Sequence, residues 1–130
     1  MQKPNTKTTD QNLKIEFQRR VYIYTLKSLN IIGDIPEDKI TKIIINQLIR
    51  SLTSIGANII EAKASSSKRD FAHYFDIALK SANETKYWLY LLRDLNKINK
   101  EKIQKIIEET QEIANILGSS LLTMRKKNTV

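Results

Sequence analysis

The feature of this sequence that most restricts its fold is an apolar repeat with a spacing of three and four residues. The clearest example lies within residues 68–95 and consists of Phe71, Phe75, Ala78, Ala82, Thr85, Leu89 and Leu92. A similar repeat within residues 100–125 consists of Ile103, Ile106, Thr110, Ile113, Leu117, Leu121 and Met124. Such a repeat lines the side of a helix that packs against other helices, as in four-helix bundles. Both segments are therefore predicted to be long helices of an all-α fold.

Two more helices are predicted in the first half of the chain. The helix over residues 12–32 has one apolar face that consists of Leu13, Phe17, Val21 and Tyr24. The helix over residues 37–63 has a main apolar face that consists of Ile44, Leu48, Leu52, Ile55 and Ile59. In both segments the apolar residues recur with the period of an α-helix.

Turn signals separate the four helices. Pro36 precedes two acidic residues, which is typical of a helix start, and Ser67 with an aspartate three residues later resembles a capping box. Long helices joined by short turns pack against their chain neighbours in opposite directions. We therefore expect an antiparallel up-down-up-down four-helix bundle over residues 12–125. We expect residues 1–11 to be flexible and residues 126–130 to form a polar basic tail.

Composition excludes several classes of protein. The chain has 130 residues, which favours a single domain, and it has no cysteine, so it can form neither a disulfide nor a thiolate metal site. The N-terminus lacks the apolar segment of a secretory signal. The uncharged apolar runs are shorter than the roughly 20 residues that span a bilayer. We therefore expect a cytoplasmic protein with no membrane contact.

The sequence offers little for catalysis or metal binding. It has no phosphate-binding glycine loop and no cysteine nucleophile, and its single histidine, His73, has aspartates three residues away on either side but no evident nucleophile. Di-iron bundles need Glu-x-x-His motifs, and here Ala64 follows Glu61 and Tyr87 follows Glu84 at that spacing. We expect a non-enzymatic protein with no metal, no cofactor and no catalytic residue.

A polar stripe runs beside the apolar face of the predicted second helix and has a counterpart on the third. Its members are Gln47, Arg50, Ser51, Ser54, Asn58, Glu61, Ser81 and Glu84. Polar groups inside a bundle are costly unless they are paired. One interpretation is a hydrogen-bonded network that fixes the register of the helices, with Asn58 reaching across to the neighbouring helix. The other is a ligand or metal site; we favour the network.

The same stretch carries a family resemblance. "QLIRSLTSIGANIIEA" resembles the Q-x-x-R-[AS]-x-x-S-I-x-x-N-I-x-E-G signature of the 23S rRNA intervening-sequence proteins, which are four-helix bundles. "FAHYFDIALKSANETKYWLYLLRDL" resembles their next helix, with its A-x-x-S-x-x-E core. The resemblance covers about residues 13–125. Two departures are Ala62, where the family usually has glycine, and Leu79-Lys80, where a glycine commonly precedes the serine.

The resemblance implies a homo-oligomeric ring, commonly a pentamer, with a basic surface. The family is similar to the accessory variability protein of diversity-generating retroelements, which implies binding to nucleic acid and to a reverse transcriptase for that relative. Two functions therefore stay open for this chain. One is binding of RNA or DNA, and the other is a scaffold for a protein partner such as a reverse transcriptase, with the charge serving solubility.

The positive charge favours nucleic-acid binding, because it falls in segments that an up-down-up-down bundle brings to one end. The net charge is +8. Residues 1–20, 61–70 and 121–130 hold eleven basic and four acidic residues, so they account for +7 of it. The candidate contacts to phosphate, which we call the basic pole, are Lys14, Arg19, Arg20, Lys63, Lys68, Arg69, Arg125, Lys126 and Lys127. No groove-reading motif is visible, so we expect binding without sequence specificity.

Some apolar residues lie outside the predicted seams. They include Ile45, Ile49, Leu91 and Leu95. A helix that is apolar on more than one face needs a second partner. In a small bundle we expect this partner to be another subunit. The aromatic residues Tyr87, Trp88 and Tyr90 are expected to serve as core or interface anchors, with base stacking as the alternative.

Overall fold

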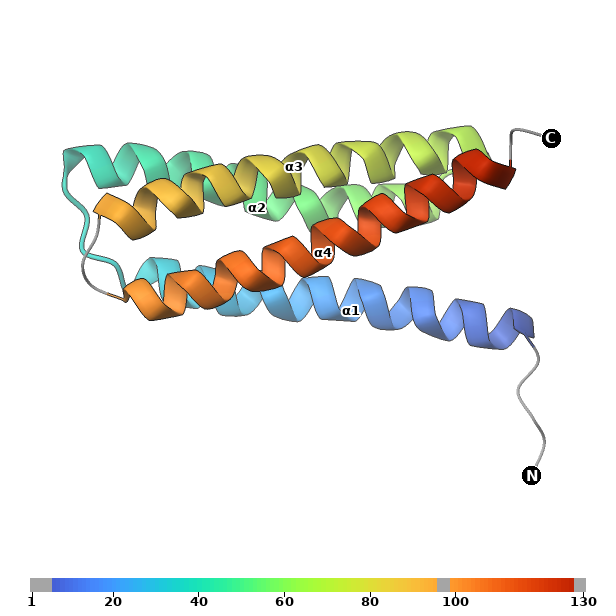
Figure 1. The fold of residues 1–130 in the computed structure, drawn as a ribbon, viewed down its shortest axis with the longest axis horizontal. Helices are drawn as coiled ribbons and strands as arrows, with labels where there is room; N and C mark the ends of the chain where they lie inside the picture. Colours follow the sequence, from blue (N-terminus) through green and yellow to red (C-terminus); the bar gives the residue numbers. More distant parts are fainter. Residues whose placement is uncertain (1–5, 96–98, 128–130) are drawn as a thin grey trace, which may run out of the picture.

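The computed structural model describes residues 6–95 and 99–127, and it consists of four helices in this part of the chain. These are α1 (Thr6–Gly33), α2 (Lys39–Ala64), α3 (Lys68–Leu95) and α4 (Lys100–Lys127). Side chains are described from residue 15 to residue 126 within these ranges. The described residues contain no strand, and the predicted all-α four-helix bundle is confirmed (Figure 1).

Helices that follow one another in the chain lie side by side, and α4 returns to pack against α1. Figure 1 shows that the first residues of α1, the connection between α2 and α3, and the last residues of α4 lie at one end of the molecule. The connection from α1 to α2, the last residues of α3 and the first residues of α4 lie at the other end. The three segments of the basic pole therefore share one end.

The helices differ from the predicted ranges mainly at the chain ends. α1 begins at Thr6, six residues before the predicted start, so residues 6–11 are helical. α4 continues to Lys127, two residues beyond its predicted end, which shortens the predicted tail. Extending an existing helix costs little once the first turn has formed, so polar residues can lengthen it without an apolar face. Residues 1–5 and 128–130 lie outside the described residues.

Side chains and backbone conformation explain where the other helices start. Asp38 is the N-cap of α2, and its carboxylate accepts a hydrogen bond of 2.7 Å from the Thr41 amide. This bond lowers the pKa of Asp38, because it stabilises the charged form. Ser67 caps α3 in the same way, accepting a 3.1 Å bond from the amide of Asp70. Asn99 has a φ of 65°, in the left-handed region that asparagine tolerates, directly before α4.

The core lies between α2, α3 and α4 and is built from the predicted seams. Its fully buried members include Leu48, Leu52, Ile55, Leu89, Leu92, Ile103, Ile113 and Leu117. Among the side chains that the structure describes, α1 adds a narrow buried strip, with Phe17, Leu29 and Ile31 packed against the core beside it. The strip consists of Val21, Tyr24, Ser28 and Ile32. Within the described residues, α2 is the one helix long and apolar enough by composition to cross a membrane. Core helices share that composition, and α2 packs between α1 and α3.

Candidate nucleic-acid interface and polar seam

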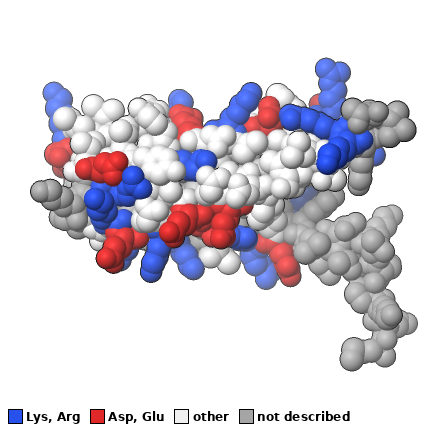
Figure 2. All heavy atoms as spheres, viewed as in Figure 1, with Lys and Arg blue, Asp and Glu red and all other residues white. Residues whose placement is uncertain are grey.

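The basic pole consists of surface side chains on three different segments. Arg19 on α1, Lys63 on α2, Lys68 and Arg69 at the start of α3, and Arg125 with Lys126 on α4 are all exposed. Figure 2 shows Lys and Arg side chains gathered where α4 ends. Lys14 and Lys127 belong to α1 and α4, but their side chains lie outside the described residues. Long, exposed cations on adjoining helix ends form a surface that suits a phosphate backbone.

Arg20 pairs with carboxylates on α4. The guanidinium of Arg20 donates to both carboxylate oxygens of Glu109 on α4, at 2.7 and 3.0 Å, and also to Glu112. The Arg20 bond holds the pKa of the Glu109 carboxyl below its usual range, and Glu109 raises the pKa of Arg20. Arg20 therefore links α1 to α4, and its contact with phosphate stays a prediction.

Acidic residues reduce the net positive charge near the basic pole. Glu16, Glu61 and Asp70 are exposed near the same helix ends. Figure 2 also shows a band of acidic side chains along the boundary between α4 and α1. A polyanion would therefore meet the cations on α3 and α4 with the least repulsion, away from this acidic band.

The polar stripe on α2 and α3 splits into an inner and an outer part. The inner part joins the two helices: the Ser54 and Ser81 hydroxyls lie 2.9 Å apart, and the Thr85 hydroxyl lies 3.0 Å from that of Ser51. Ser51, Ser81 and Thr85 are buried, and Thr85 also donates to the backbone oxygen of Ser81 at 2.7 Å. These bonds pair hydroxyls that would otherwise be costly to bury.

Asn58 does not cross to α3, contrary to the prediction. Its side-chain amide donates to the backbone oxygen of Ser54 at 2.8 Å and to the Ser54 hydroxyl at 3.0 Å, both on α2. The residue four positions earlier is within reach on the same helix face, so the amide is satisfied locally. Asn58 thus orients Ser54, and Ser54 makes the contact with α3.

The outer part of the stripe stays at the surface. Arg50, Glu61 and Glu84 are exposed, and Gln47 is half-buried. Within the described residues, Gln47, Arg50 and Glu61 form no side-chain hydrogen bond with the inner hydroxyls. Glu84 accepts a 3.2 Å bond from the Trp88 indole on its own helix. Charged side chains at the edge of the seam keep their solvation, so the predicted network is smaller than expected.

Thr85 and Thr110 form buried polar contacts, although the sequence pattern placed both in apolar seams. Thr85 links α2 to α3, and Thr110 on α4 lies 2.5 Å from the hydroxyl of Tyr24 on α1. Thr110 donates to the backbone oxygen of Ile106, so Tyr24 donates to Thr110. Burial of Tyr24 raises the pKa of its phenol. The sequence signal for these contacts was a threonine at a seam position, because a buried hydroxyl requires a hydrogen-bond partner.

Within the described residues, no group of three or more acidic or histidine side chains is arranged to hold a metal ion. His73 is exposed and contacts the edge of the Tyr74 ring, with centroids 5.5 Å apart.

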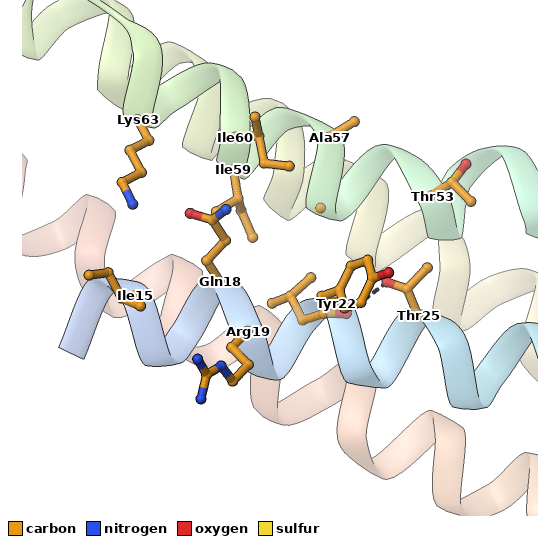
Figure 3. A pocket seen from close by; sticks show the side chains of 12 residues that line it. Ile15, Gln18, Arg19, Tyr22, Thr25, Thr53, Ala57, Ile59, Ile60 and Lys63 are labelled. Carbon is orange, nitrogen blue, oxygen red and sulfur yellow. Dashed lines mark hydrogen bonds between the residues drawn. The ribbon is translucent and has the colours of Figure 1, made fainter. Parts of the chain in front are cut away.

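Two open grooves flank α1. The α1–α2 groove has a volume of about 520 Å³ and lies between the side chains shown in Figure 3. The α1–α4 groove has a volume of about 700 Å³ and includes Ile23, Ile31 and Ile106. In the first groove the side-chain oxygen of Gln18 is buried and has no hydrogen-bond partner in the described part of the chain. α1 therefore has an open groove on each side, and one of the two grooves holds an unpaired buried oxygen.

Comparisons with known proteins agree with this architecture. A crystal structure of a protein with unknown function from the S23 ribosomal protein family of Bacteroides thetaiotaomicron VPI-5482 has a TM-score of 0.75 to this chain. The two are 33% identical, and the match covers 83% of this chain and 96% of the other. No match was found among curated proteins. The family model of the 23S rRNA-intervening sequence protein matches residues 14–119, so the chain belongs to this family.

Proposed function

We propose that this protein is non-enzymatic, assembles into a homo-oligomeric ring of five subunits, and binds RNA or DNA non-specifically through the basic pole. In this proposal each subunit is an antiparallel up-down-up-down bundle in the cytoplasm. The observation that carries it is the set of exposed cations on three segments that meet at one end of the bundle. Copies with parallel axes would join these ends into one basic face.

Binding would depend on the phosphates rather than on the bases. Cations that neutralise phosphates release condensed counterions, which makes the affinity fall steeply with salt. The described pole offers flexible lysine and arginine side chains and no element shaped to enter a groove. We therefore expect similar affinities for different sequences of the same nucleic acid.

A charge-removal experiment tests this function. A variant with Lys68, Arg69, Arg125 and Lys126 changed to glutamine should lose most of its affinity for a structured RNA fragment and for duplex DNA. The matched control changes Lys39, Lys42, Lys100 and Lys102, which lie at the opposite end, to glutamine. For duplex DNA, each lost phosphate contact should reduce the slope of log affinity against log salt by about 0.9. Equal affinity of the two variants would overturn the proposal.

A second candidate is a scaffold for a protein partner such as a reverse transcriptase, with the charge serving solubility. The exposed apolar side chains of Tyr87, Tyr90 and Leu95 on α3 favour it, because exposed aromatic residues often anchor protein contacts. The absence of nucleic-acid binding at low salt would favour this candidate over the first.

A further inference from the structure

The α1–α2 groove combines apolar walls with positive charge. Its walls include Ile15 on α1 and Ile59 and Ile60 on α2. Both charged side chains that line it, within the described residues, are cations: Arg19 and Lys63. The groove lies on the flank of α1 that faces α2, whereas the acidic band in Figure 2 follows the boundary between α4 and α1. An anionic group can therefore approach this groove without crossing that band.

Tyr22 adds an aromatic ring to the groove. Its side chain is 65% exposed, and Figure 3 shows the ring rising from α1 on the side of α2. The facing stretch of α2 presents Gly56 and Ala57, whose small size leaves room beside the ring for a flat group. An exposed aromatic ring offers a stacking surface that every nucleic-acid base can use, because each base has a π-face.

Gln18 supplies a hydrogen-bond acceptor without a donor. It lies four residues before Tyr22, on the same side of α1, and Figure 3 shows its side chain extending toward α2 beside Ile59. Its Oε1 atom is buried and has no hydrogen-bond partner among the described residues. A buried acceptor without a donor costs free energy, so an occupant that brings an N–H group into the groove is favoured.

An unpaired nucleotide carries the three groups that these residues can bind. Its phosphate is an anion, its base is flat and aromatic, and the edge of its base holds at least one N–H donor. Base pairing and stacking occupy the edge and faces in a duplex, whereas single strands and loops leave them available. The groove volume of about 520 Å³ lies within the range of small-ligand sites, which is roughly 300–1,000 Å³.

We propose that the α1–α2 groove binds one unpaired nucleotide of a nucleic-acid strand. The base stacks on Tyr22 and donates a hydrogen bond to Oε1 of Gln18, and the phosphate lies against Lys63 and Arg19. This site rests on the nucleic-acid binding proposed above and adds the form of nucleic acid that the protein prefers. Because every base has a π-face and an N–H donor, the groove favours single strands over duplexes without reading a sequence.

Substitutions at Tyr22 separate stacking from charge. The probes are labelled single strands of RNA and DNA of one mixed sequence and the DNA duplex of that sequence, and fluorescence anisotropy measures each Kd at one low salt concentration. Tyr22→Leu should weaken single-strand binding about tenfold, as expected for the loss of one stacked base, and leave duplex binding unchanged. Tyr22→Phe keeps the ring and is the matched control, so it should bind single strands like the unaltered protein.

Gln18→Met tests the hydrogen bond, because methionine has a similar length but no strong acceptor. This variant should weaken single-strand binding about threefold and leave duplex binding unchanged. A single-strand affinity equal to that of the unaltered protein would remove Gln18 from the proposed site.

The outcomes distinguish this site from the function on which it rests. Thermal melts and native mass spectrometry first compare the fold and the subunit number of each variant with those of the unaltered protein. Equal affinity for single strands and duplex, or equal single-strand affinities of Tyr22→Leu and Tyr22→Phe, would overturn the nucleotide site alone. A changed subunit number in Tyr22→Leu would also overturn it, because Tyr22 would then be a contact between copies. No binding of any probe would overturn the site and the basic pole together.

Discussion

α1 and the α2–α3 pair are held in the molecule in different ways. α2 and α3 pack along a seam of buried leucine, isoleucine and alanine side chains. This seam also contains paired hydroxyls, such as those of Ser54 and Ser81. α1 buries a narrow strip, has open grooves on both flanks, and is tied to α4 by the Arg20–Glu109 pair and the Tyr24–Thr110 bond. The difference shows that, where a helix buries little apolar surface, specific polar contacts make up a larger share of what holds it in place.

The largest expected effect comes from opening the α2–α3 core. Leu52 is fully buried, so Leu52→Ala should reduce the free energy of unfolding by about 2–5 kcal/mol through lost burial and a residual cavity. Leu26→Ala, at an exposed position on α1, serves as the matched control and should reduce the free energy of unfolding far less. Urea unfolding measures both. Similar losses for the two variants would contradict the contrast between the regions.

Removing one hydroxyl from each region compares the two polar contacts. Tyr24→Phe deletes the bond to Thr110, and Thr85→Val deletes the contacts to Ser51 and Ser81; each should cost about 1 kcal/mol. Hydrogen exchange should separate them, because Tyr24→Phe is expected to raise exchange mainly in α1. Thr85→Val should raise it in α2 and α3. Equal changes across all helices would mean that α1 opens only together with the rest of the bundle.

Gly56 tests whether a small residue is required where α1 meets α2. A Cβ added at Gly56 would lie 3.5 Å from a Val21 methyl group, which is an ordinary contact distance. Alanine is favoured over glycine inside a helix, so Gly56→Ala should stabilise the protein by about 0.5–1 kcal/mol. A rise in melting temperature is the expected readout. A fall would show that α1 packs more tightly on α2 than the open groove indicates.

The smallest effect is expected at the Arg20–Glu109 pair. The pKa of Glu109 is lowered in the folded protein, so its contribution is present above the usual pKa of a glutamate and is lost as the pH falls through the lowered value. The side chains of Arg20 and Glu109 are 39% and 33% exposed, which limits the contribution of the pair to about 0.5 kcal/mol. Glu109→Gln should flatten the acid limb of the stability profile slightly. An unchanged dependence of stability on pH would show that the Arg20–Glu109 pair does not help to hold α1 on α4.

Much of the fold could be predicted from sequence because the apolar seams have helical periodicity. The seams of α2, α3 and α4 predicted the core, and the range of α3 agrees with the structure at both ends. The ends of α1 and α4 were less predictable, because polar residues without an apolar face carry no periodic signal. Residues 6–12 of α1 are polar, and they are helical as a continuation of the helix that Val21 and Tyr24 anchor.

The candidate sites, too, were predictable in some features and unpredictable in others. The amino-acid sequence by itself determined the helices, the seams that pair them and the excess of cations in three segments, because these follow from residue type and spacing. Only the tertiary structure decided which polar groups meet. Arg20, a predicted phosphate contact, reaches Glu109, 89 residues away, and Thr85 looked apolar but completes the seam with Ser51. Such pairings depend on the rotation and height of one helix against another, which the spacing of residues along a single helix does not specify.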